Sequence, residues 1–247
     1  MSSNPSLVFT IHKTFSPDKT LEKDANGYYK VLMGALNSYN NVGEFYVAEG
    51  IKEIMANKDS LVNKRLTAGY LVGEMGHPQF QPGMTKADYI HRIMQLDQKN
   101  TSHHIRSVEF VPGPNGMVKT VGWVKPAGPQ GELLRESLDN PDRNTAFSLR
   151  AITADYIDKG RTMKKIMEFV TWDWVPMPGI EIANTWQTIS TESIDIVEFS
   201  PRELDDIIKE IRNTNIGLED NGVLDTLKSL CHTAKQEENC NHMLNSW

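Results

Sequence analysis

The amino-acid sequence predicts an α+β fold in which helices surround a β-barrel or sheet. Segments with strand-like apolar runs alternate along the chain with segments whose apolar residues recur at the helical period. The chain has 247 residues, 39% of them hydrophobic, which is enough to bury a sizeable core without disulfides. We expect one main domain over residues 1–200, followed by a helical segment over 201–247 that carries nine acidic and five basic side chains.

The first half of the chain is predicted to contain one clear strand and three helices. The strand covers residues 28–36 and follows the turn-forming pair Asn26-Gly27. Residues 46–56 carry apolar side chains at helical intervals, and a second helix is expected over 60–70. Thr85 and Asp88 have the spacing of a capping box, which begins a third helix with an apolar stripe.

The second half of the chain predicts a hairpin, two further strands and three helices. Strand-like stretches flank the turn-rich residues 112–116, so a hairpin is expected. A short helix and a polar turn follow, and then two apolar strands, the second of which is rich in β-formers. Ser200, Pro201 and Glu203 have the pattern of a helix start. The predicted ranges are 105–111 and 117–124 for the hairpin, 132–138 for the short helix, 140–144 for the turn, 146–154 and 164–175 for the strands, and 223–235 for a last helix.

The charge and hydropathy of the chain exclude several classes of protein. The net charge is -6 and the pI is about 5.7, which argues against a nucleic-acid partner, because such affinity comes largely from clustered Lys and Arg. No apolar run approaches the roughly 20 residues that cross a bilayer, and residues 1–16 lack the layout of a signal peptide. We therefore expect a cytoplasmic protein that binds neither nucleic acid nor membrane. The oligomeric state is not fixed by the sequence, so a homo-oligomer stays open.

The two cysteines, Cys231 and Cys240, lie near the C-terminus. A disulfide framework is therefore not expected, and a reducing compartment fits. Together with His232 and His242 they form a string that loosely resembles a metal site, but the short paired spacings of zinc ligands are missing. We expect polar tail residues here, and neither a metal nor another cofactor.

Three segments carry residue types that serine peptidase chemistry needs. That chemistry uses a hydroxyl nucleophile, an imidazole that takes its proton, a group that orients the imidazole, and donors for the oxyanion. His77 is followed by Pro78, which disfavours helix at His77 and leaves its backbone extended or turning. The ring should therefore be presented by a turn. A turn histidine without chemistry would leave the same pattern.

The other two segments are strands. Ser148 lies in an apolar strand with Arg150 two residues later, so both side chains face the same side. Arg150 would then support the oxyanion region by fixing a loop or a water. Asp173 lies between Trp172 and Trp174, where an unpaired carboxylate is costly, so an imidazole or guanidinium partner is expected. The alternatives are a serine on a sheet surface beside a solvated arginine, and an aspartate on the wet face of a strand.

In their order and spacing these strings resemble the prohead core proteases of T-even and giant tailed phages. The resemblance rests on Gly-Glu-x-x-His-Pro at 73–78, on hydrophobic-Ser-x-Arg at 147–150, and on the strand acid followed by Val and Pro at 173–176. An Asn-rich stretch at 37–41 also resembles the segment that opens the family's domain. The resemblance spans roughly residues 28–180. It implies a β-barrel like that of the herpesvirus assemblin proteases, surrounded by helices, because the two groups are similar in fold.

Carried over residue by residue, the resemblance implies His77 as the catalytic base and Ser148 as the nucleophile, with Arg150 supporting the oxyanion region. Asp173 matches the strand acid and is the favoured orienting group. Leu149 and Ala151 depart from the Ser-Ser-Arg-Gly string of T-even members, and this departure bears on the oxyanion region. Assemblins use a second histidine in place of the acid, so the alternative orienting groups here are His103 and His104.

The implied function is that of a serine endopeptidase that cleaves phage scaffold and capsid proteins inside the assembling prohead, in the host cytoplasm. Giant-phage proteases cut after Ser-x-Glu, and this tripeptide occurs at 107–109 and 190–192. We expect self-processing at the second, between Glu192 and Ser193, because it separates the main domain from the acidic segment.

Two other functions have less support in the sequence. A non-catalytic capsid or scaffold assembly protein that retains the protease fold would be expected to lose the serine or the histidine, and both are present. A metal hydrolase would have to draw on His77, His91, His103 and His104, but no His-Glu-x-x-His or comparable spacing supports it.

Overall fold

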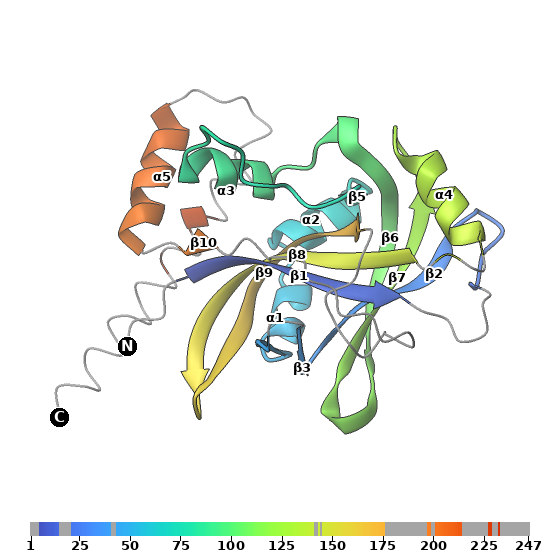
Figure 1. Cartoon of the computed structure of the whole chain (residues 1–247), viewed down its shortest axis with the longest axis horizontal. Helices are drawn as coiled ribbons and strands as arrows, with labels where there is room; N and C mark the ends of the chain where they lie inside the picture. Colours follow the sequence, from blue (N-terminus) through green and yellow to red (C-terminus); the bar gives the residue numbers. More distant parts are fainter. Residues whose placement is uncertain are drawn as a thin grey trace.

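Two β-sheets with helices around them make up the protein (Figure 1). The computed structural model describes residues 5–14, 21–40, 43–140, 143, 145–175, 197–198, 201–213, 227–228 and 232. The strands are β1 (Pro5–Thr14), β2 (Tyr29–Leu36), β3 (Ser38–Tyr39), β4 (Phe45–Val47), β5 (Val72–Glu74), β6 (Thr101–Pro112), β7 (Val118–Pro126), β8 (Thr145–Asp158), β9 (Arg161–Val175) and β10 (Val197–Glu198). The α-helices are α1 (Ile51–Ala56), α2 (Leu61–Ala68), α3 (Lys86–Met94), α4 (Gly131–Asp139) and α5 (Pro201–Asn213).

The first sheet has the strand order β10-β1-β8-β9-β4-β3, and the second has the order β2-β7-β6-β5. The hairpins β6–β7 and β8–β9 both project from the lower side of the body in Figure 1. Antiparallel pairing of β8 with β9 places Ser148 opposite Asp173 and Arg150 opposite Thr171. The backbone register alone therefore brings two of the predicted site residues, Ser148 and Asp173, close together.

The two sheets meet at a corner formed by β5 and β9. There the Thr171 hydroxyl donates to the Val72 carbonyl at 2.6 Å, and Met75 forms an isolated bridge with Trp174. A Cβ atom on Gly73 would lie 2.1 Å from the Trp172 carbonyl oxygen and 2.3 Å from the His103 ring. Only glycine therefore permits this close approach of the sheets.

The β-barrel that the resemblance implied is not what the described strands form. They make two sheets whose hydrogen-bonded orders do not close on themselves. The physical reason lies at the β5–β9 corner, where one bridge and a side-chain hydrogen bond replace a continuous ladder. The broader prediction of mixed strands and helices is confirmed.

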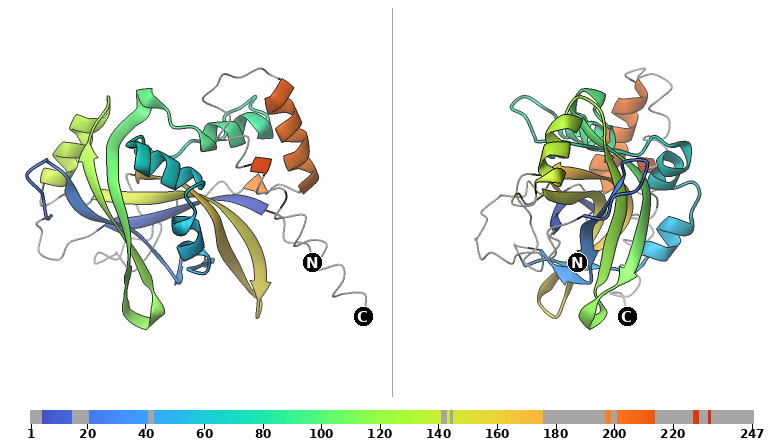
Figure 2. Two further views of the ribbon diagram at one scale, coloured as in Figure 1. Left: turned by 180° about the vertical axis from the view of Figure 1, so that it is seen from behind. Right: turned by 90° about the vertical axis from the view of Figure 1, so that its right-hand side faces the viewer.

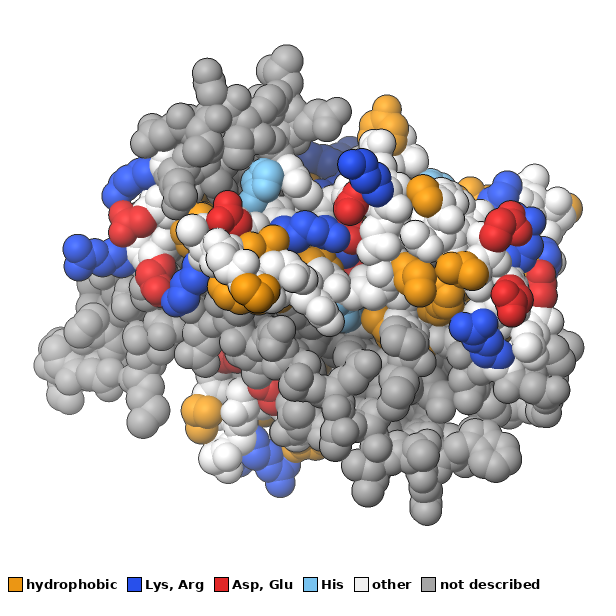
Figure 3. All heavy atoms as spheres, turned by 45° about the horizontal axis from the view of Figure 1, so that its top comes forward, with side chains coloured by type: hydrophobic (Ala, Val, Ile, Leu, Met, Phe, Trp, Pro, Cys, Tyr) orange, Lys and Arg blue, Asp and Glu red, His pale blue; other side chains and the backbone are white. Residues whose placement is uncertain are grey.

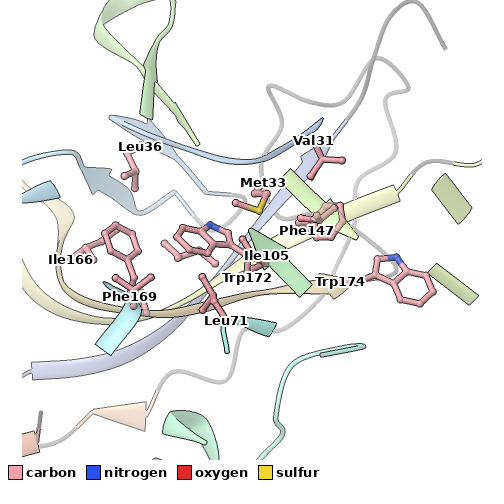
Figure 4. Packing of buried hydrophobic residues seen from close by; sticks show 14 of the residues in the cluster. Val31, Met33, Leu36, Leu71, Ile105, Phe147, Ile166, Phe169, Trp172 and Trp174 are labelled. Atoms are coloured by element: carbon pink, nitrogen blue, oxygen red, sulfur yellow. The ribbon is translucent and has the colours of Figure 1, made fainter. Parts of the chain in front are cut away.

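The main hydrophobic core fills the space between the sheets. Phe147 and Trp172 extend from β8 and β9, and they meet Met33 from β2 and Ile105 from β6 (Figure 4). Phe169 stacks on Trp172 with ring centroids 5.5 Å apart. Successive side chains of β8 and β9 point to opposite faces of the sheet, so core residues on one face alternate with the predicted site residues on the other.

One predicted helix begins later than expected. Residues 45–47 form β4, which pairs in parallel with β9, so Tyr46 lies in the core opposite Lys164. Helix α1 starts only at Ile51, after Gly50 has turned the chain with a φ of 84°. Tertiary pairing with β9 therefore overrides the helical spacing of residues 46–56.

The capping box and the C-terminal helix fall where the sequence predicts them. The Thr85 side chain accepts from Asp88 N–H, and the Asp88 carboxylate accepts from the Thr85 backbone. Helix α5 lies beside α3 in both views of Figure 2, and its Ile207 and Ile208 share an apolar cluster with Ile90 and Ile93 of α3. In the predicted helix 223–235, residues 227, 228 and 232 are helical and the others lie outside the described residues. The division of the chain at residue 200 stays a prediction.

The surface carries charges of both signs. On the face of Figure 3, Lys and Arg side chains alternate with Asp and Glu, and small groups of hydrophobic side chains lie between them. None of the described helices is long and apolar enough to span a membrane.

Candidate active site

A short turn after β5 presents His77. The Gly76 N–H donates to the Trp174 carbonyl at 2.7 Å, and the Met75 N–H donates to the Asn100 carbonyl at 3.0 Å. Gly76 has a φ of 76°, a conformation that glycine adopts without strain. The turn is thus fixed to β9 on one side and to the segment before β6 on the other. The ring is presented by a turning backbone, as the His-Pro pair predicts.

His77 joins Ser148 to Asp173. Its Nε2 is in hydrogen-bond contact with the Ser148 Oγ, and its Nδ1 lies 2.8 Å from the Asp173 Oδ2. The carboxylate accepts the Nδ1 proton, which leaves Nε2 free to accept the hydroxyl proton. Ser148 and Asp173 are fully buried, whereas the His77 side chain is 13% exposed. This arrangement has the chemical capacity of a nucleophile, a base and an orienting acid.

Arg150 and a backbone amide hold the Asp173 carboxylate. The Arg150 Nε donates to Oδ2 at 2.8 Å, one terminal nitrogen donates to Oδ1 at 2.7 Å, and the Glu74 N–H donates to Oδ1 at 3.0 Å. Burial alone would raise the pKa of the Asp173 carboxyl, but the Arg150 charge and the hydrogen bonds from His77 and Glu74 lower it to about 2. The carboxylate is therefore ionised at neutral pH.

The Arg150 guanidinium also contacts groups beyond the Asp173 carboxylate. Beyond Asp173, its guanidinium donates to the carbonyls of Ile93 and Gln95, at 3.2 and 3.0 Å, and lies 3.1 Å from the Glu74 carboxylate. Together with Asp173, these partners give the guanidinium four hydrogen bonds and a further ion pair. Arg150 thus fixes the backbone at the end of α3, and its support of the oxyanion region stays a prediction.

Comparison with known proteins places these residues in a family. The model of the Peptidase S80 family matches residues 10–230. The chain belongs to the Peptidase S80 family.

Two relatives are informative about this S80 peptidase. It is 35% identical over 225 residues to the capsid maturation protease of Pseudomonas phage phiKZ, a match that covers 85% of this chain and 82% of the relative. It is also similar to the solved structure of the bacteriophage T4 capsid assembly protease, with a TM-score of 0.50 and 12% identity, over 70% of this chain and 98% of that one. The second likeness concerns the fold. The predicted resemblance to phage prohead proteases is confirmed, in sequence for the giant-phage type and in fold for the T-even type.

The histidines proposed as alternatives to Asp173 have other partners in this S80 peptidase. His103 is fully buried, its Nδ1 lies 2.9 Å from the Ser102 hydroxyl, and its ring packs edge-on against Phe147. Burial lowers the pKa of the His103 imidazole to about 4. The two ring nitrogens of His104 contact the Tyr28 hydroxyl and the Gly69 carbonyl. The position at Nδ1 of His77 belongs to Asp173.

Several predicted residues cannot be placed. Glu192 and Ser193, the expected autocleavage site, lie outside the described residues, as do Cys231, Cys240 and His242. Within the described part of this S80 peptidase, no group of three or more His, Cys, Asp and Glu side chains is arranged to hold a metal ion. His91, which the metal-hydrolase reading used, contacts the Gln95 side chain.

Sequence reasoning assigned no role to Glu74 and did not consider Arg92 or Arg65. Arg92 pairs with Glu74, and Arg65 donates to the carbonyls of Val170 and Met94. A signal was available for Glu74, because its carboxylate follows the apolar run 71–73 on a strand and must find a partner. No comparable signal marks the two arginines, which lie on amphipathic helices among ordinary surface charges.

Proposed function

We propose that this chain is a serine endopeptidase that cleaves scaffold and capsid proteins during the maturation of a phage head. The observation that carries the proposal is the continuous hydrogen-bonded line from the Ser148 Oγ through His77 to Asp173. Membership of the Peptidase S80 family supports the reaction class. The phiKZ relative is a capsid maturation protease and the T4 protein is a capsid assembly protease, which supports the choice of substrates.

In the proposed mechanism, the Ser148 Oγ attacks the scissile carbonyl while His77 Nε2 takes the hydroxyl proton. The resulting imidazolium donates to Asp173 through Nδ1, and the negative charge of Asp173 stabilises it. His77 then gives the proton to the leaving amine, which departs as the acyl-enzyme forms. A water molecule, deprotonated in turn by His77, hydrolyses the acyl-enzyme and restores Ser148.

The proposal includes cleavage after Glu in Ser-x-Glu sites and self-processing between Glu192 and Ser193. The other tripeptide of this type in the chain, Ser107-Val108-Glu109, lies in β6 with its backbone paired to β7. An active-site cleft would reach it only after local unfolding of that hairpin. This leaves Glu192 as the favoured self-processing position. Kinship with the herpesvirus assemblins stays a prediction.

The alternative of a non-catalytic assembly protein has less support. A protein that kept only the scaffold of the fold would have no requirement for a serine, an imidazole and an ionised carboxylate in one hydrogen-bonded line. In this chain the line is complete, and Arg150 holds its carboxylate in place.

The decisive experiment is labelling of the purified protein with a fluorophosphonate probe. We expect the parent to be labelled at Ser148, and labelling to fall by about 10³-fold or more in Ser148→Ala and in His77→Ala. Ser137→Ala is the matched control, because Ser137 is also buried and hydrogen-bonded, to the Thr145 hydroxyl at 2.7 Å. Parental labelling of Ser148→Ala would contradict the assignment. Incubation with candidate head proteins, with the new termini mapped by mass spectrometry, then tests cleavage after Glu.

A further inference from the structure

We infer that Glu74 is a positioning residue that acts through Arg150: it holds the Asp173–Arg150 pair in place beneath His77 and balances its charge. The inference rests on the proposed function, and it adds a second layer of residues to the proposed site. Glu74 is the last residue of β5, three residues before His77, and its carboxylate is fully buried.

The carboxylate of Glu74 contacts three groups from three directions. Arg92, on α3, donates to it through both terminal nitrogens, one of them at 3.1 Å to Oε1. Arg150, on β8, places a terminal nitrogen 3.1 Å from Oε1. The Asp97 backbone N–H donates to Oε1 at 2.9 Å. Glu74 therefore fixes the face of Arg150 that Asp173 does not fix.

Glu74 also contacts Asp173 directly through its backbone, which donates to Oδ1. The same Arg150 nitrogen thus lies between two carboxylates, at 2.7 Å from Asp173 and 3.1 Å from Glu74. A guanidinium with one carboxylate could pivot about that pair. With carboxylates on two sides and the carbonyls of Ile93 and Gln95 on a third, its orientation is determined.

The four charged side chains described above have no net charge. Asp173 and Glu74 supply two negative charges, and Arg150 and Arg92 supply two positive ones. When His77 takes the Ser148 proton, a new positive charge appears beside this neutral set. Without the Glu74 charge, the set would already be positive, and the imidazolium would be disfavoured. Besides His77, the ionisable groups that interact within or with this set are Asp173 on β9, Arg150 on β8, Glu74 on β5, Arg92 on α3, Asp97 after α3, Arg65 on α2 and His103 on β6.

Two charge-neutralising variants should therefore move the pH profile in opposite directions. The measurement is the second-order rate of fluorophosphonate labelling of the full-length chain as a function of pH. In Glu74→Gln we expect the labelling rate to reach half of its plateau value at a pH (the midpoint) roughly 0.5–1 pH unit lower than in the parent. We also expect the plateau labelling rate to fall about 10-fold. In Arg92→Gln, which removes a positive charge one step further out, we expect the midpoint to move higher.

Asp155→Asn is the matched control, because Asp155 pairs with the buried Lys164 in a separate cluster. It should lower stability and leave the midpoint unchanged. A folded Glu74→Gln with the parental midpoint would overturn the inference and reduce Glu74 to a structural residue. If Glu74→Gln does not fold, Arg92→Gln decides: an unchanged or lowered midpoint overturns the inference. Absence of Ser148-dependent labelling in the parent would instead refute the proposed function.

Discussion

Two ionic clusters of this protein each surround a fully buried cation, and they differ in the groups that pair with it. Around Asp173, fully buried Arg150 pairs with two carboxylates, and the imidazole of His77 contacts one of them. Around Lys164, a fully buried ammonium lies 3.1 Å from the Glu44 carboxylate and 2.6 Å from that of Asp155. The second cluster ties Glu44 to the β8–β9 hairpin.

The difference between the clusters shows which feature points to chemistry. Buried charge is present in both, so it indicates only that partners were needed. The Asp173 cluster adds an imidazole that contacts both an ionised carboxylate and a hydroxyl, and whose edge reaches solvent. In the Lys164 cluster, Glu44 is held by a local contact: the Asn40 side chain accepts from the Glu44 N–H and donates to the Glu44 carboxylate. Asn40, from the Asn-rich stretch of the resemblance, thus has a structural contact here.

The strongest test of this comparison removes one carboxylate from each cluster. Asp173→Asn should reduce the rate of peptide hydrolysis by about 10³–10⁴-fold, because the amide favours the wrong tautomer of His77. Asp155→Asn should keep activity within about twofold of the parent, since it lies in no path to Ser148. Both are measured as kcat/KM on a Ser-x-Glu peptide. Similar losses of kcat/KM in the two variants would contradict the assignment of chemistry to the Asp173 cluster alone.

A second test removes the cation of each cluster and measures stability. Arg150→Met leaves Asp173 and Glu74 fully buried, so the free energy of unfolding should fall by about 3–5 kcal/mol. Lys164→Met leaves carboxylates that are 12% and 20% exposed, and solvent reduces the loss to about 1–3 kcal/mol. Urea unfolding at neutral pH gives both values. A larger loss for Lys164→Met would reverse the ranking.

A third test concerns the pH dependence of stability caused by His103, a buried imidazole outside both clusters. Its pKa is about 4 in the fold and near 6.5 in the unfolded chain, so the unfolded chain binds the proton between these values. Stability must therefore fall as the pH is lowered from about 6.5 to about 4, by up to about 3 kcal/mol. Urea unfolding at pH 7 and pH 4.5 measures this loss, and His103→Gln should diminish it. An equal pH dependence in parent and variant would assign the loss to other groups.

The part of the site that the sequence predicts is local. Ser148 and Arg150 share a face because strands repeat every two residues, and Asp173 needs a partner because its strand is apolar. The link from Arg150 to Glu74 was not predictable in this way. It depends on how β5 packs against β8 and β9, and the spacing of residues within a single strand or helix does not predict such long-range packing.

The same limit explains the two errors in the fold. Residues 46–56 have helical spacing, but Tyr46 and Val47 pair with β9, more than a hundred residues away. The barrel was expected from a resemblance, whereas closure depends on whether β5 and β9 form a ladder or touch at one bridge. Thr85 and Asp88 were predicted correctly because a capping box is complete within four residues.

The distribution of the proposed triad along the chain has a consequence for synthesis. His77 precedes Ser148 by 71 residues and Asp173 by 96, and the residues come from opposite sides of the β5–β9 corner. A ribosome releases the chain from its N-terminal end, so the serine emerges before β9 can pair with β8. The nascent polypeptide has no assembled triad until both sheets dock. The proposed proteolytic capacity therefore depends on a late, long-range folding step.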